Sequence, residues 1–261
     1  MNTLYKYPRT QHIEGSGLQA GDDDQGMVPY QALAGRHLVV EEKMDGANSA
    51  ISFTKQGKLL LQSRGHYLTG GPRERHFALL KAWASRYTTS LWDLLGDRYV
   101  MYGEWLYARH TIFYTDLPHY FLEFDILDTQ TSHYLDTPRR QALLASTPFI
   151  QSVRVLHAGV VPSYTDLIRM AGPSAFISAH HLEHLRQQCA RLGIDPGTAV
   201  RETDPTTLME GLYIKAEKEG TVTDRYKYVR AGFLQTVFDA GSHWLDRPII
   251  ANQLRSGVEL F

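Results

Sequence analysis

The stretch that decides the fold is Glu41-Glu42-Lys43-Met44-Asp45-Gly46-Ala47-Asn48, which joins two strand-like segments at residues 37–42 and 49–54. An Asp-Gly turn between two such segments predicts a tight connection, and Gly46 permits the compact backbone that this connection needs. The pattern therefore holds the amine of Lys43 at a fixed position, with the carboxylate of Asp45 nearby. The alternative is an ordinary β-hairpin in which Lys43 is only exposed to solvent.

The remaining chain shows strand patterns with interspersed helices. Further strands are predicted at residues 58–63, 99–107, 120–127, 153–161, 211–217 and 225–230. Helices are predicted at residues 75–95, 138–145, 164–171 and 174–192, the last closed by Gly193 and Pro196. Residues 1–36 are interpreted as loop-rich. Because strands and helices do not alternate strictly, the sequence predicts an α+β fold of antiparallel sheets with flanking helices.

The composition limits the classes of protein to consider. A chain of 261 residues with 43% hydrophobic content is long enough to bury one substantial core. The net charge of -1 excludes a strongly basic tail but allows a local basic groove for nucleic acid. The single cysteine, Cys189, excludes an internal disulfide and a four-cysteine zinc site. Because no apolar stretch approaches the roughly 20 residues of a membrane span, we expect a cytoplasmic protein without membrane contact.

The segment around Lys43 resembles the lysine motif of the covalent nucleotidyltransferases, which are ATP-dependent RNA and DNA ligases and RNA capping enzymes. Five further segments resemble the other motifs of that superfamily, and they follow in its order: Ser63-Arg64-Gly65, Tyr102-Gly103-Glu104-Trp105, Phe121-Leu122-Glu123-Phe124-Asp125-Ile126, Glu210-Gly211-Leu212-Tyr213-Ile214-Lys215 and Arg225-Tyr226-Lys227-Tyr228. Each is weak alone. Six in order over residues 37–230 favour membership of the superfamily.

The resemblance implies a role for each matching residue. Lys43 would attack the α-phosphate of ATP and carry AMP covalently, with Asp45, Lys215 and Lys227 as the other catalytic residues. Nucleotide contacts are implied for Glu42, Lys43, Asn48, Arg64, Glu104, Phe124, Glu210, Lys215 and Lys227. Glu104 would hold the ribose, Phe124 the base, and Glu210 a Mg²⁺ or Mn²⁺ ion. Arg225 stands where the family usually has a lysine, so the role of position 225 is left open.

The chemistry adds expectations of its own. Lysine is a nucleophile only when neutral, and its usual pKa is about 10.4. We expect Lys215, Lys227, Arg64 and a bound Mg²⁺ to lower the pKa of Lys43. Asp45 and Asp125 are expected to orient the lysine or a metal-bound water.

An adenine ring requires two apolar faces. Phe124 or Phe121 supplies one face, and Ile214 or Tyr213 supplies the other. Arg9 and His12, near the N-terminus, are weaker candidates for contact with nucleotide or substrate.

About thirty residues follow Arg230, which is too few for the OB-fold of DNA ligases and capping enzymes. The resemblance therefore favours an ATP-dependent RNA ligase similar to the second RNA ligase of phage T4. It implies a single ATP-grasp-like adenylylation domain over residues 1–261, with a helical insertion at about 163–208 and a short C-terminal extension at about 232–261. The implied substrate is RNA with 5′-phosphate and 3′-hydroxyl ends, and an end-healing kinase or phosphatase is a possible partner.

Two alternatives to this interpretation stay open. One is a DNA ligase or a capping guanylyltransferase, which would share the chemistry at Lys43. The other is a non-catalytic nucleic-acid-binding relic of a ligase.

Overall fold

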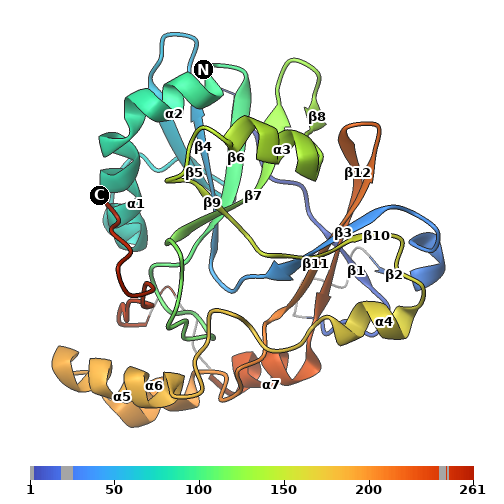
Figure 1. Ribbon diagram of the computed structural model, residues 1–261. Helices are drawn as coiled ribbons and strands as arrows, with labels where there is room; N and C mark the ends of the chain where they lie inside the picture. The colour runs from blue at the N-terminus through green and yellow to red at the C-terminus, as the bar shows by residue number, and fades with distance from the viewer. Residues whose placement is uncertain (1–2, 19–25, 241–244, 246) are drawn as a thin grey trace.

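The computed structural model describes residues 3–18, 26–240, 245 and 247–261, which build two β-sheets with helices around them (Figure 1). The first sheet contains, in spatial order, β10 (Val155–Gly159), β3 (Leu38–Lys43), β11 (Gly211–Lys218), β12 (Thr221–Val229), β1 (Gln11–Ile13) and β2 (Met27–Val28). The second contains β5 (Leu59–Ser63), β4 (Ala47–Phe53), β6 (Tyr99–Trp105), β7 (Phe121–Asp128) and β8 (His133–Tyr134). A short strand, β9 (Gln151–Ser152), also pairs with β7.

Most strand pairs are antiparallel, which confirms the predicted fold class. The exceptions are the pairs of β1 with β12, β1 with β2, and β7 with β9, all of which are parallel. The chain leaves the first sheet at the end of β3 and enters the second at the start of β4. The Lys43 turn therefore crosses between the sheets and does not close a hairpin within one of them.

Helices surround the sheets, and Figure 1 shows α1 and α2 beside the second sheet, with α5, α6 and α7 at the lower end of the molecule. Their bounds are α1 Ala78–Arg86, α2 Thr88–Leu95, α3 Thr137–Leu144, α4 Tyr164–Arg169, α5 His181–Leu192, α6 Pro196–Arg201 and α7 Ala231–Ala240. Short 3₁₀ turns occur at Tyr30–Ala32 and Pro72–Phe77.

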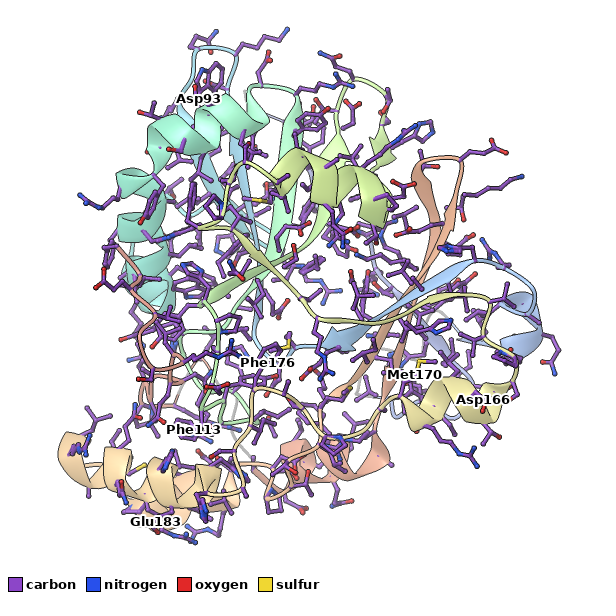
Figure 2. The ribbon with its side chains drawn as sticks, in the orientation of Figure 1. Asp93, Phe113, Asp166, Met170, Phe176 and Glu183 are labelled. Carbon is purple, nitrogen blue, oxygen red and sulfur yellow. The ribbon has the colours of Figure 1, made fainter. Side chains whose placement is uncertain are left out.

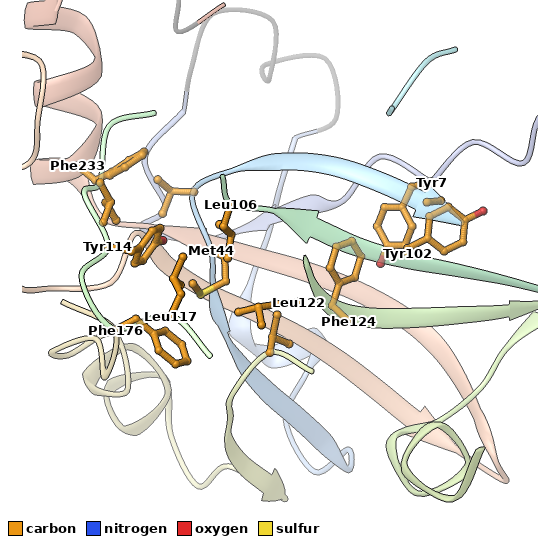
Figure 3. Packing of buried hydrophobic residues seen from close by; sticks show 14 of the residues in the cluster. Tyr7, Met44, Tyr102, Leu106, Tyr114, Leu117, Leu122, Phe124, Phe176 and Phe233 are labelled. Atoms are coloured by element: carbon orange, nitrogen blue, oxygen red, sulfur yellow. The ribbon is translucent and has the colours of Figure 1, made fainter. Parts of the chain in front are cut away.

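The main apolar core lies between the sheets and draws on both of them. It includes Met44 after β3, Leu122 and Phe124 on β7, and Phe233 on α7 (Figure 3). A separate core packs α1 and α2 against the second sheet, with Trp83 fully buried at its centre. Phe77, Leu80 and Leu91 of this helical region are buried in the same core.

The structure corrects three local predictions. The helix expected at residues 75–95 is interrupted at Tyr87, whose backbone leaves helical geometry, so α1 and α2 are separate. The helix expected at 174–192 begins only at His181, because residues 174–180 are irregular and bury Phe176 in the main core. Gly193 ends α5 in the left-handed conformation as predicted, but Pro196 begins α6, with Asp195 as its N-cap.

The N-terminal region is more ordered than predicted. Within the described part of residues 1–36, the short strands β1 and β2 extend the first sheet. No helix of the described residues is long and apolar enough to cross a membrane.

Candidate active site

A cavity of about 1200 Å³ lies between the sheets, and the predicted residues meet there. Of the catalytic and nucleotide-contacting residues that the resemblance implies, all except Lys215 line this cavity: Glu42, Lys43, Asp45, Asn48, Arg64, Glu104, Phe124, Glu210 and Lys227. The first sheet provides Lys43 and Lys227, whereas the second provides Asn48, Glu104 and Phe124. Motifs that are distant in the sequence therefore converge on one space.

Lys43 is the last residue of β3 and pairs with Gly211, the first residue of β11. This register brings Nζ of Lys43 to 2.5 Å from Oε1 of Glu210, the residue just before β11. Burial lowers the pKa of Lys43, but the carboxylates of Glu210 and Glu104 outweigh burial and leave that pKa raised. The residues of this chain alone therefore keep the amine protonated at neutral pH, contrary to the expectation that neighbouring cations lower its pKa.

Glu104 and Glu210 are the two carboxylates beside Lys43. Burial raises the pKa of Glu104 to about 8 and that of Glu210 to about 7, and in both cases Lys43 acts in the opposite direction. Oε2 of Glu210 is buried, and no group among the described residues donates a hydrogen bond to it. The two side chains therefore ionise only near neutral pH or above it, and Glu210 keeps one oxygen available to a ligand.

The fit of a divalent cation depends on this oxygen. Within the described ranges, no group of three or more His, Cys, Asp or Glu side chains is arranged to hold a metal ion. Mg²⁺ in phosphate-transfer sites, however, takes only one or two protein carboxylates and completes its shell with waters and phosphates. The unbonded oxygen of Glu210 fits such a site.

Asp45 fixes the turn that follows Lys43. Its Oδ2 accepts hydrogen bonds from the backbone N–H of Thr111, at 2.7 Å, and of Ile112, at 2.6 Å. Its own N–H donates to the hydroxyl of Tyr114, at 2.8 Å. All three partners belong to residues 106–117, here called the 106–117 loop, which connect β6 toward β7. The loop therefore determines where Asp45 lies.

The helical region around α5 and α6 packs against the 106–117 loop from outside. Arg109 donates to Oε2 of Glu202 at 3.1 Å, and the carbonyl of Thr111 accepts from the N–H of Asp204 at 2.8 Å. Phe113 packs in an apolar cluster with residues of α5 (Figure 2). The region that interrupts the motifs thus supports the loop that holds Asp45.

Phe124 and Tyr213 form the aromatic part of the cavity. Their ring centroids lie 6.0 Å apart, and the ring of Tyr7 meets Phe124 edge-on at 5.2 Å. The structure places the alternative candidates elsewhere, because Phe121 stacks on a tryptophan in the core beside α1 and Ile214 is buried in the core of the first sheet. Of the alternatives considered from sequence, Phe124 and Tyr213 are therefore the pair that lines the cavity.

Lys215 does not line the cavity. Its Nζ is fully buried, 2.8 Å from Oε2 of Glu41 and 3.4 Å from Oδ1 of Asp125. Arg225 donates from Nε to Oδ2 of Asp125 at 2.8 Å. Burial raises the pKa of Asp125, but Lys215 and Arg225 outweigh it and lower the pKa to about 2.

This ion network explains two departures from the sequence-based expectations. Lys215 lies outside the residues that line the cavity, and Asp125 pairs with Lys215 and Arg225. Both charges are instead neutralised inside the protein. Arg225, which replaces the usual lysine, belongs to the same buried network.

Other lining residues lie outside the recognised motifs. Tyr7 and Thr10 reach the cavity from the N-terminal segment, where Arg9 and His12 were expected to do so. His12 does not line it, and its Nδ1 lies 2.7 Å from Oγ of Ser16. The C-terminal region supplies Phe233, Leu234, Val237, Leu245 and Arg247. Apolar spacing predicts a helix there, but no sequence signal shows that this helix faces the site.

Comparisons with known proteins agree with this geometry. The family model described as RNA ligase matches residues 36–229. No curated protein sequence matches significantly. A mutant of the Naegleria gruberi RNA ligase solved with ATP and Mn has a TM-score of 0.52 at 17% identity, covering 80% of this chain and 54% of that one. The same enzyme solved with PPi has a TM-score of 0.52 at 17% identity, covering 91% of this chain and 65% of that one.

An archaeal ATP-dependent RNA ligase has a TM-score of 0.48 at 16% identity, covering 88% of this chain and 49% of that one. The chain thus spans between about half and two thirds of the length of these structures. At such identities the structural likeness supports the fold alone. The family model, however, covers most of the chain, from just before β3 to the end of β12. The chain belongs to the RNA ligase family.

Proposed function

We propose that this protein is an ATP-dependent RNA ligase in which Lys43 becomes covalently attached to AMP. The observation that carries the proposal is the position of the Lys43 amine, 2.5 Å from Glu210, in a cavity of about 1200 Å³. The aromatic rings of Phe124 and Tyr213 line the same cavity. The structures of the Naegleria gruberi enzyme with ATP and Mn and with PPi support this choice of ligands.

In the first step, Nζ of Lys43 forms a bond to the α-phosphorus of ATP, and the bond to pyrophosphate breaks. The amine must lose its proton beforehand, because only the neutral form is nucleophilic. Lys227 and Arg64 face the phosphates and stabilise their charge, which is the main catalytic contribution in phosphoryl transfer. Glu104 holds the ribose, and Phe124 and Tyr213 hold the base.

Glu210 would hold a Mg²⁺ or Mn²⁺ ion, with Glu104 nearby. When bound, the cation offsets the negative charge of the phosphates and of the carboxylates that keep Lys43 protonated. In the remaining steps AMP passes to an RNA 5′-phosphate, and a 3′-hydroxyl displaces it as the strands are joined. The reaction needs RNA with a 5′-phosphate and a 3′-hydroxyl. A kinase or phosphatase that restores these end groups would be a partner enzyme.

The first test is label transfer from ATP that is radioactive at the α-phosphate, with Mg²⁺ or Mn²⁺ present. We expect label on the wild-type protein and none on Lys43→Ala, since no other lysine replaces the nucleophile. Lys55→Ala is the matched control, because Lys55 is exposed in the turn between β4 and β5 and should label normally. Absence of label on the wild type with either metal would contradict the proposal.

A second measurement distinguishes related activities. Preferential labelling from GTP would indicate a capping guanylyltransferase. Sealing of a 5′-phosphorylated strand across RNA, DNA and hybrid nicks, with the adenylated strand followed as intermediate, would separate RNA ligase from DNA ligase. Binding to nucleic acid without labelling or sealing would indicate a non-catalytic relic.

A further inference from the structure

Asn252 lies in the C-terminal region, beyond the residues that the family model matches. Its side chain is 1% exposed, and both of its polar atoms are used. Oδ1 accepts a hydrogen bond from the N–H of Tyr114 at 2.9 Å, and Nδ2 donates to the carbonyl of Leu106 at 2.7 Å. One amide thus joins both ends of the part of the 106–117 loop that contacts Asp45.

The backbone on either side of this amide strengthens the same attachment. The N–H of Asn252 donates to the carbonyl of Tyr107 at 2.8 Å, and the N–H of Gln253 donates to the carbonyl of Tyr114 at 2.9 Å. A tight fold of the loop follows, because its two ends are held against one short stretch of chain. Figure 3 shows Tyr114 and Leu106 of this loop beside Met44, the residue after Lys43.

The chain of contacts continues from the loop to the nucleophile. The hydroxyl of Tyr114 accepts from the N–H of Asp45, and the amides of Thr111 and Ile112 donate to its carboxylate. Asp45 is two residues from Lys43 in the turn that crosses between the sheets. One loop end offers the N–H of Tyr114 and the other the carbonyl of Leu106, so the side chain must both accept and donate a hydrogen bond. An amide can do both, whereas an ionised carboxylate can only accept.

We propose that Asn252 is a positioning residue for nucleotide transfer at Lys43. It holds the 106–117 loop in the form that fixes Asp45, and through Asp45 it fixes the turn that presents the amine. Asn252 itself is absent from the residues that line the cavity, so it acts through the loop. The inference rests on the proposed function and extends it to a residue outside the family-matched part of the chain.

The test compares Asn252→Asp with Gln253→Glu, the same change from amide to acid at the next residue. Gln253 donates its backbone N–H to the loop, whereas its side chain donates from Nε2 to Oε1 of Gln188 at 3.3 Å. Single-turnover formation of lysyl-AMP is measured over a range of ATP concentrations, and each rate is divided by the fraction of protein that can be labelled. We expect Asn252→Asp to slow the maximal rate at least tenfold while the half-saturating ATP concentration changes less than about threefold. Gln253→Glu should match the wild type.

A double-mutant cycle with Asp45→Ala separates positioning from a general loss of stability. If Asn252 acts through Asp45, adding Asn252→Asp to Asp45→Ala slows labelling by less than twofold beyond Asp45→Ala alone. A purely structural role would make the two effects multiply. Equal maximal rates for Asn252→Asp and the wild type, or multiplying effects, would overturn the inference.

Tyr114→Phe covers the case in which Asn252→Asp does not fold. It removes the hydroxyl that accepts from Asp45 and leaves both hydrogen bonds of the Asn252 side chain intact. We expect it to slow the maximal rate in the same way, and an unchanged rate would overturn the inference. Failure of the wild type to label would instead contradict the proposed function, so the two failures are distinguishable.

Discussion

At the scale of single residues, the site is defined by acids that hold protons more tightly than usual. Glu104 has a raised pKa of about 8 and Glu210 one of about 7, because both are buried. These two carboxyl groups lie beside the amine of Lys43, whose own pKa is raised, so all three neighbouring groups bind protons more tightly than usual. A ligand that brings positive charge must displace some of these protons, which couples binding to pH.

The stability of the protein should therefore depend on Glu104. Between pH 5.5 and about 8 the folded protein retains a proton on Glu104, which the unfolded chain, with a usual pKa near 4.5, has already released. Stability from this group falls as pH rises, since the folded state binds more protons than the unfolded state in that range. The free energy of unfolding of the wild type should decrease between pH 5.5 and 8.5. In Glu104→Gln this decrease should be smaller by on the order of 2 kcal/mol, as measured by urea unfolding at each pH.

Glu183→Gln is the control, because Glu183 is exposed on α5 and pairs only loosely with Arg186, at 3.9 Å. Its pH dependence should match that of the wild type. A Glu104→Gln variant whose stability falls with pH as steeply as the wild type would show that Glu104 ionises normally.

At the scale of elements, strand register brings together charges that the motifs list separately. Lys215 on β11 lies between Glu41 on β3 and Asp125 on β7, although these residues are far apart in the chain. All three side chains are fully buried. The network joins the two sheets beside the cavity, since Glu41 also lines it, and we expect it to hold the sheets together.

Replacing Lys215 should therefore destabilise the fold. Lys215→Met leaves the carboxylates of Glu41 and Asp125 without this cation, and removing one partner of a buried ion pair costs about 3–5 kcal/mol. Lys218→Met, three residues further along β11, is the control, because that side chain is 75% exposed and should change stability by less than about 0.5 kcal/mol. Equal unfolding midpoints for the two variants in urea would contradict this role.

The same elements show what the sequence predicts and what it does not. Lys43, Asn48 and Glu104 were predicted because each lies in a short local motif whose residues are adjacent in the chain. The buried state of Lys215 was not predicted, because it depends on the pairing of β11 with β3 and on the packing of β7 from the other sheet, which no local pattern encodes. The position of Asn252 was equally hidden, since one polar residue in a mixed tail carries no periodicity.

At the scale of the whole molecule, the two sheets share one core. Met44, Leu122 and Phe124 meet residues of α7 in that core, although each sheet also packs a separate apolar cluster. Because the shared core joins the two sheets, unfolding one sheet exposes apolar surface of the other. The tail and the helices α5 and α6 are tied to this body through the 106–117 loop.

The described body should consequently unfold cooperatively. Far-ultraviolet circular dichroism and tryptophan fluorescence should give coincident urea transitions. Met44→Ala should shift both transitions equally to lower urea concentration. The free energy of unfolding should fall by about 2–5 kcal/mol, because a buried methionine is truncated. Leu192→Ala is the control, because Leu192 is 52% exposed and its truncation should leave both midpoints nearly unchanged. Separate transitions for the two probes would show that the sheets unfold independently.

The crossing of the chain between sheets at Lys43 has a consequence for any molecule held in the cavity. The groups that face such a molecule are divided between the sheets, with Lys43 and Lys227 on one and Asn48, Glu104 and Phe124 on the other. A nucleotide bound there would contact both sheets at once and so would hold them together. In the proposed reaction AMP is attached covalently to Lys43 of the first sheet only, so the contacts from the second sheet are the ones that can separate from it when the sheets move apart.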